Sequence, residues 1–314
     1  MATDDVEPTR LRGRAPGRRS IFWDTFSDTT LGPFAIPILV MQTAHPDIGA
    51  AVARYSIYRS DPWGRLVRTG FSLMRFLYDG DGGKQAEREA KALRELHTNI
   101  RGTRPDGGSY HATRPRSFRI VPDTFLDAVV RVRETLGRPL DAAEKEQVFE
   151  EYLELCMLFG IKRSLLEPTF EEFFVYYDRL MLEEMTYNET ARFLLEGMIK
   201  HGPEMGLPKR LNDAWQAFYR RAVYPPIRIF TIGFLDPRFR AKHGIRWSAR
   251  DQAHYERSVA AVRTFAAVVP RWARTNPFAL YVMAGGHGAQ LMDFARLERA
   301  LAKRASRPRH VRAA

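Results

Sequence analysis

The chain of 314 residues is 45% apolar and 12% aromatic, which supplies a large hydrophobic core and excludes a disordered protein. Its single cysteine, Cys156, excludes an internal disulfide framework, a cysteine-rich zinc site and a two-cysteine haem attachment, and it makes a reducing cytoplasm the expected compartment. The net charge of +12 would suit nucleic acid, but the central part of the sequence contains no recognisable nucleic-acid-binding module.

The excess positive charge is concentrated at the two ends of the sequence. Residues 1–20 carry five arginines against three acidic residues (+2), and residues 296–314 carry six arginines and one lysine against Glu298 (+6). We therefore expect a basic flexible N-terminal tail over residues 1–24, a helical domain over residues 25–285 and a basic C-terminal helix or tail over residues 286–314. Solvated tails are the simplest interpretation, and loose contact with an anionic membrane or with nucleic acid is the alternative. No specific nucleic-acid partner is expected.

Between the tails, the sequence predicts an all-α fold in a single multi-helix domain. Apolar residues recur at helical spacing, and short alternating segments of the kind that form strands are nearly absent. The expected helices span residues 48–58, 62–78, 86–101, 123–136, 141–158, 169–182, 189–199, 211–223 and 248–269. Residues 103–122, which contain Asp106-Gly107-Gly108, are expected to form a loop, and Tyr224-Pro225-Pro226 is expected to interrupt the helices.

Capping patterns support several of these helix starts. The pairs Asp141 with Glu144, Thr169 with Glu172 and Ser248 with Asp251 have the spacing of a capping box. Asp61-Pro62 places a proline in the first turn of the helix that follows, where its missing N–H is tolerated.

The helix expected to end before Gly102 brings a histidine to its apolar face. Residues at steps of four, three, four and three share this face: Ala86, Ala90, Leu93, His97 and Ile100. An inward imidazole needs a hydrogen bond, a counter-charge or a metal ion. From the spacing alone, a hydrogen-bonded core histidine is the commoner outcome and a metal ligand is the alternative. Arg101, four residues after His97, would reach a carboxylate beside the bound group or would simply favour the helix C-terminus.

The helix that begins at Pro62 carries Arg65, Arg68 and Thr69. Arg65 and Thr69 are four residues apart and therefore lie on the same side of the helix, with Thr69 at the border of its apolar stripe. A cation and a hydroxyl at the edge of a buried face suit an anionic or polarised ligand. A solvated arginine and a threonine facing its own helix explain the same pattern.

Several short segments, taken in order, resemble the latex-clearing rubber oxygenase family, which includes the fungal oxygenase that cleaves the mycophenolic acid side chain. These segments are His45-Pro46, Arg54 to Thr69, Leu96 to Gly102 and Asp106 to Tyr110, with weaker likeness at Gly233 to Pro237 and Arg271 to Ala279. The resemblance implies an all-helical fold that binds non-covalent haem b between helices.

The resemblance also implies roles for individual residues. His97, in its His-x-x-x-Arg-Gly run, matches the proximal iron ligand, and Arg65 and Thr69 match the arginine and threonine of the distal side. Arg101 and His45 are expected beside the cofactor, with a structural role as the alternative for His45. Arg68 stands where rubber oxygenases have a distal lysine, and a guanidinium stays protonated and does not ligate iron as an amine can.

A second departure is that residues 49–52 contain no carboxylate, whereas rubber-cleaving members have a glutamate upstream of the distal arginine. Polyisoprene cleavage by that mechanism is therefore not expected. The sequence also lacks paired Glu-x-x-His motifs, a phosphate loop and a dinucleotide fingerprint. The resemblance therefore implies a haem b-dependent oxygenase that uses molecular oxygen on a hydrophobic small molecule, of prenyl or terpenoid type. The alternative is a haem- or lipid-binding helical protein without turnover.

Overall fold

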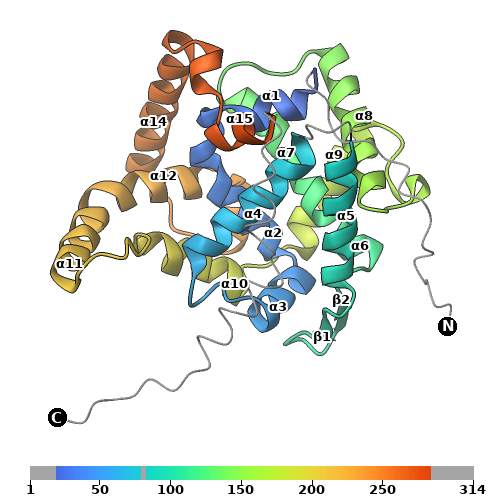
Figure 1. The fold of residues 1–314 in the computed structure, drawn as a ribbon, viewed down its shortest axis with the longest axis horizontal. Coiled ribbons are helices and arrows are strands. Elements are labelled where there is room, and N and C mark those ends of the chain that lie inside the picture. The colour runs from blue at the N-terminus through green and yellow to red at the C-terminus, as the bar shows by residue number, and fades with distance from the viewer. Residues whose placement is uncertain (1–18, 79–82, 284–314) are drawn as a thin grey trace.

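The structure, a computed structural model, describes residues 19–78 and 83–283 (Figure 1). Its elements in chain order are α1 (Ile21–Ser27), η1 (Thr29–Phe34), α2 (Ala35–Ala44), α3 (Pro46–Tyr55), α4 (Pro62–Leu77), α5 (Lys84–His97), β1 (Arg101–Thr103), β2 (Ser109–His111), α6 (Pro115–Phe118), α7 (Ile120–Thr135), α8 (Ala142–Leu158), η2 (Arg163–Leu165), α9 (Phe170–Arg179), η3 (Leu180–Glu184), α10 (Glu189–Arg192), η4 (Phe193–Gly197), η5 (Met198–Lys200), α11 (Lys209–Phe218), η6 (Tyr219–Val223), α12 (Tyr224–Phe234), α13 (Pro237–Lys242), α14 (Ala249–Val268), η7 (Arg271–Arg274) and α15 (Pro277–Met283).

The all-α prediction is confirmed, because the strands of the described residues are two three-residue segments that pair as one hairpin. The expected caps are present. Asp141 and Ser248 each form a complete capping box, and the Asp61 side chain accepts a hydrogen bond from the backbone N–H of Gly64. These caps satisfy N–H groups that the first turn of a helix leaves without partners.

The core is built around α7, which is buried along most of its length and packs against α1, α2 and α8. α1 begins at Ile21, and Phe22 and Trp23 are buried in the core. Residues 21–24 therefore belong to the helical domain and not to the expected tail. Glu151 of α8 anchors this start by accepting hydrogen bonds from the Ser20 hydroxyl and from two backbone N–H groups of α1. The predicted C-terminal segment 286–314 lies outside the described residues.

The helix expected over residues 86–101 ends earlier, at His97. Residues Arg101 to Thr103 form β1 instead, with Gly102 paired to Tyr110 of β2 and Gly107 in the turn at a φ of 86°. The apolar pattern alone predicts one more helical turn, but the backbone forms the hydrogen bonds of this hairpin instead. The same hairpin, together with α6, replaces part of the expected loop, and α7 starts at Ile120 and not at residue 123.

Pro225 and Pro226 do not interrupt the helices. They are the second and third residues of α12, directly after η6, and residues 209–234 form one continuous helical run through that turn. η3, η4 and η6 are π-helical, which is a rare form in which the hydrogen bond spans five residues.

Two neighbouring helices, α4 and α5, carry Arg65, Arg68, Thr69 and His97 and pack side by side (Figure 1). Glu89 of α5 joins them, because it accepts hydrogen bonds from Ser72 Oγ at 2.5 Å and from Arg75 Nη1 at 3.0 Å. No helix in the described ranges is both long enough and apolar enough to cross a lipid bilayer.

Candidate functional site

His97 is the last residue of α5, and its ring is held by a local hydrogen bond. Nδ1 lies 2.6 Å from the backbone carbonyl oxygen of Leu93, one helical turn earlier. A carbonyl oxygen only accepts, so Nδ1 must carry the proton and donate it. In a neutral ring the lone pair is then on Nε2, to which no described residue hydrogen-bonds.

The surroundings of His97 favour this neutral form. Burial lowers the pKa of His97, the bond to Leu93 opposes that change, and the positive charge of Arg65 lowers the pKa further. On one side the ring meets Phe118 edge to face, with centroids 5.7 Å apart. Phe118 in turn contacts Phe159, which stacks on Phe76 of α4. An aromatic wall therefore separates the imidazole from water on this side.

Arg65 and Thr69 form a linked pair on α4. Arg65 Nη1 donates to Thr69 Oγ1 at 3.0 Å, and the Thr69 hydroxyl donates to the Arg65 carbonyl oxygen at 2.9 Å. Arg65 Nε also donates to Ser56 Oγ, in the segment before α4, at 3.3 Å. Because Arg65 also acts on the pKa of His97, the structure brings a cation, a hydroxyl and a neutral imidazole into one neighbourhood between α4 and α5.

Arg68 is only 5% exposed, and its contacts point to the start of its own helix. Nη1 donates to Asp61 Oδ2 at 2.9 Å, and Asp61 is also the residue that caps α4. Nε and Nη2 of Arg68 are buried and have no hydrogen-bond partner. Unpartnered buried donors cost about 1–3 kcal/mol each, so this guanidinium is suited to a bound anion.

His45 and Arg101 are in other surroundings. His45 is buried before α3, its Nδ1 has no partner, and burial lowers its pKa while Asp47 and Glu184 oppose that change. Asp47 is held by Arg104 and by Ser117 of α6. Arg101 is exposed on β1, where its carbonyl oxygen accepts a hydrogen bond from Tyr55 Oη at 2.8 Å. Neither His45 nor Arg101 contacts His97 in the part of the chain that the structure describes.

The donor set suits a cofactor that needs one protein ligand. In residues 19–78 and 83–283, no three His, Cys, Asp or Glu side chains are grouped so that they could hold a metal ion by themselves. A single imidazole is nevertheless enough for iron that a macrocycle already binds through four nitrogens. Both the available Nε2 of His97 and the unpartnered donors of Arg68, which suit a carboxylate, fit haem b.

Several contributors to this site were missed from the sequence. The Leu93 carbonyl is found by counting four residues back from His97, and Asp61 by counting two turns back from Arg68. Ser56 and Phe118 have no such signal, because each comes from a different element and Phe118 lies in the stretch that was expected to be a loop.

Comparisons with known proteins identify the family to which the chain is similar. The model of the family described as "ER-bound oxygenase mpaB/B'/Rubber oxygenase, catalytic domain" matches residues 23–264. Two similar sequences are the uncharacterized protein Rv2237 of Mycobacterium tuberculosis and the uncharacterized protein Mb2261 of Mycobacterium bovis. Each is 23% identical over 247 residues, which is 78% of this chain and 92% of the relative. No solved structure matches the chain.

Proposed function

This chain belongs to the family of the mpaB and rubber oxygenases, and from that premise we propose that it is a haem b-dependent oxygenase of hydrophobic small molecules, of prenyl or terpenoid type. The family supports oxygenase chemistry in general. The observation that carries the haem proposal is the neutral ring of His97, whose Nδ1 is engaged by Leu93 and whose Nε2 is available.

In this proposal His97 holds the iron, and the bond from Nδ1 to the Leu93 carbonyl fixes the orientation of the ring and increases the electron donation by Nε2. Haem, when bound, supplies the iron that activates molecular oxygen. Arg65 and Thr69 would provide a cation and a hydroxyl that stabilise negative charge where it develops. The mutual hydrogen bonds of Arg65 and Thr69 keep both groups in position before substrate arrives.

Arg68 has a different role in the proposal. Its buried donors, Nε and Nη2, would bind a carboxylate, while its charge is already partly balanced by Asp61. Because its guanidinium stays protonated, Arg68 would not ligate the iron of a bound haem as an amine can. The expected positions of Arg101 and His45 beside the cofactor gain no support from a contact with His97, so the proposal does not use them.

The test begins with the absorption spectrum of protein that was expressed with a haem supply. We expect a Soret band at about 400–415 nm, typical of histidine-ligated haem, and its loss or displacement in His97→Ala. His254→Ala, a matched change on the distant helix α14, should leave the band unaltered. A wild-type protein without the band, or a band that is indifferent to His97→Ala, would contradict the proposal.

A second readout of the same proteins separates the oxygenase from a haem-binding protein without turnover. Wild-type protein should form oxygen-dependent products from a panel of terpenoids. Arg65→Ala should keep the Soret band and lose about a hundredfold in product formation, since one charge-stabilising donor contributes about 3 kcal/mol in such sites. Haem binding with no product from any member of the panel would favour the non-catalytic alternative.

A further inference from the structure

The helix α11 projects from the edge of the molecule (Figure 1), and none of its residues is buried. Large apolar side chains are exposed on it and in the segment before it: Met205 (54%), Leu207 (45%), Leu211 (57%) and Phe218 (57%). Within α11, Leu211, Ala214 and Phe218 follow one another at helical spacing and are all exposed. An apolar surface of this kind on a folded domain marks a contact with another phase or molecule.

Other side chains of α11 fasten it to the loop that precedes it and to η6, which follows it. Trp215 Nε1 donates to the Pro203 carbonyl oxygen at 3.0 Å, and its ring lies 5.8 Å from that of Tyr219. Gln216 exchanges two hydrogen bonds with the backbone of Gly202, at 2.9 and 3.0 Å. The exposed apolar residues are therefore presented by an anchored element.

The same segment of the chain carries an excess of positive charge. Residues 200–221 contain five basic residues (Lys200, Lys209, Arg210, Arg220, Arg221) against Glu204 and Asp213, a net charge of +3. Asp213 is already paired with Lys209. Arg210, Arg220 and Arg221 are exposed, and none forms an ion pair with another described residue. We call the four apolar residues Met205, Leu207, Leu211 and Phe218, together with these three arginines, the α11 face.

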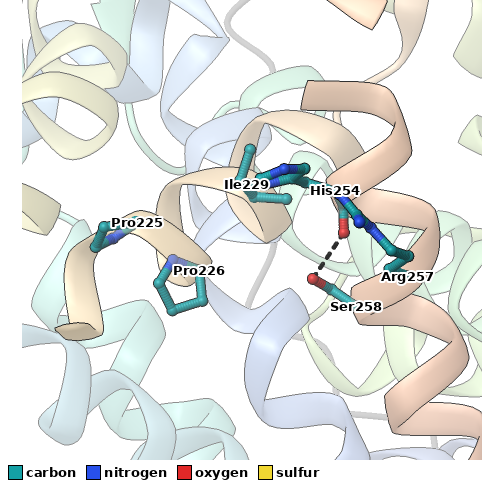
Figure 2. Close-up of a pocket in the computed structure, with 6 residues that line it drawn as sticks. All are labelled: Pro225, Pro226, Ile229, His254, Arg257 and Ser258. Atoms are coloured by element: carbon teal, nitrogen blue, oxygen red, sulfur yellow. Dashed lines mark hydrogen bonds between the residues drawn. The ribbon is translucent and has the colours of Figure 1, made fainter. Parts of the chain in front are cut away.

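The surface after η6 has the same character. Pro225 and Pro226 of α12 are exposed and line a hollow of about 390 Å³ between α12 and α14 (Figure 2). Ile229 and, from α14, His254, Arg257 and Ser258 complete its lining. Ser258 Oγ donates to the His254 carbonyl oxygen at 2.8 Å, so the hydroxyl is satisfied within its own helix. Exposed proline and arginine side chains thus border this hollow, whereas Ile229, which also lines it, is itself buried.

We propose that the α11 face docks the protein onto an anionic lipid membrane. The apolar side chains would enter the boundary between headgroups and acyl chains, and the arginines would contact lipid phosphates. A second copy of the chain fits this face less well. A two-fold contact sets each surface against itself and would bring Arg210, Arg220 and Arg221 of both copies together without counter-charges.

The α11 face is also tied to the helix that carries Arg65. Trp63, in the first turn of α4, donates Nε1 to the His201 carbonyl oxygen at 2.7 Å, and its ring contacts Tyr219 of η6 at 6.3 Å. A hydrophobic molecule dissolved in the bilayer would therefore meet the protein beside the start of α4. The docking itself does not depend on the proposed oxygenase activity, and its test requires no haem.

The experiment measures co-sedimentation of the full-length protein with vesicles of phosphatidylcholine containing about 30% phosphatidylserine, and with phosphatidylcholine alone. We expect binding to the anionic vesicles and at least about a tenfold weaker partition coefficient for Leu211→Ser/Phe218→Ser, because two apolar side chains no longer leave water. Arg210→Gln/Arg220→Gln/Arg221→Gln should lose most of the preference for phosphatidylserine. These side chains are exposed, so both variants should retain the thermal melting curve of the wild type.

The matched control is Val268→Ser/Trp272→Ser, which removes two side chains that are exposed by 76% and 79% at the end of α14 and in η7. Unchanged binding of this control supports the proposal. Three results would overturn it. The first is a wild type that does not bind anionic vesicles. The second is a Leu211→Ser/Phe218→Ser variant that binds as the wild type does, which would assign binding to the basic chain ends. The third is a dimer that this variant dissociates, which would make the α11 face a contact between copies.

Discussion

The position of His97 between α4 and α5 lowers the pKa of its imidazole, and the direction of this shift can be measured. Burial and the charge of Arg65 both lower its pKa, so the neutral ring persists as the pH falls through 6.5, where an exposed histidine takes up a proton. An imidazole binds iron only in its neutral form. We therefore expect haem binding to extend to lower pH than an unperturbed histidine ligand would allow.

The influence of Arg65 can be tested without any cofactor. Arg65→Gln removes the neighbouring positive charge and should raise the pKa of His97, measured by NMR titration of the ring protons in the haem-free protein. Arg101→Gln is the control. Although Arg101 is only four residues from His97, it is exposed on β1, and the pKa of His97 should not respond to it. If the pKa of His97 changed in Arg101→Gln and not in Arg65→Gln, Arg101 and not Arg65 would be the arginine close to His97.

For individual residues, the spacing within one helix predicts which side chains share a face of that helix. It places His97 on an apolar face, and it pairs Arg65 with Thr69, whose hydrogen bond the structure contains. The closeness of Arg65 to His97 joins two helices, and spacing within either one cannot predict it. It was available only through the family resemblance. Arg101 was misplaced because the hairpin that removes it from the helix depends on pairing with residues ten positions later.

At the scale of elements, two glycines in helices show why local preference and packing must be separated. Gly49 of α3 lies against α10 so closely that an added Cβ would be 2.5 Å from Asn188 Nδ2 and 2.8 Å from the Thr43 carbonyl oxygen. Gly70 of α4 has no heavy atom within 4 Å of such a Cβ. Sequence alone assigns both glycines the same cost in a helix, and only the structure distinguishes them.

Opposite effects are expected from the same substitution at these two positions. Gly49→Ala should lower the free energy of unfolding by about 1–3 kcal/mol, because a backbone carbonyl and the cap of α10 must move. Gly70→Ala should raise it by about 0.5–1 kcal/mol through the better helix preference of alanine. Urea unfolding of the two variants measures both values. Equal changes of one sign would refute the close approach of α3 to Asn188.

At the scale of the whole molecule, the domain is closed by contacts between its first and last described helices. The backbone N–H of Asn276 donates to the Ser27 carbonyl oxygen at 2.7 Å, and Asp28 pairs with Thr275 in an isolated bridge. The Arg274 guanidinium forms a buried ion pair with Asp28, 246 residues away in sequence. No local pattern predicts a contact at this separation, which is why the sequence placed residues 21–24 in a tail.

Asp28→Ala should therefore destabilise the entire domain. It leaves Arg274 buried without a counter-charge, and we expect a loss of about 3–5 kcal/mol in urea unfolding. Asp213→Ala is the matched control, since it removes the same type of pair from exposed Lys209 and should cost no more than about 1 kcal/mol. A similar small loss in both variants would mean that the closing ion pair contributes little.

The π-helical turns η4 and η6 lie inside continuous helical runs, over residues 189–200 and 209–234. Each such turn contains one residue more than an α-helical turn, so the helical phase after it is displaced by one position. The periodicity that joins Leu211 to Phe218 consequently does not carry on into α12, where Ile229 and Phe230 lie in the core. Each run thus contains one residue more than an α-helix would need to present the same side chains to the core. A helical wheel drawn straight through either turn assigns inside and outside to the wrong residues beyond it.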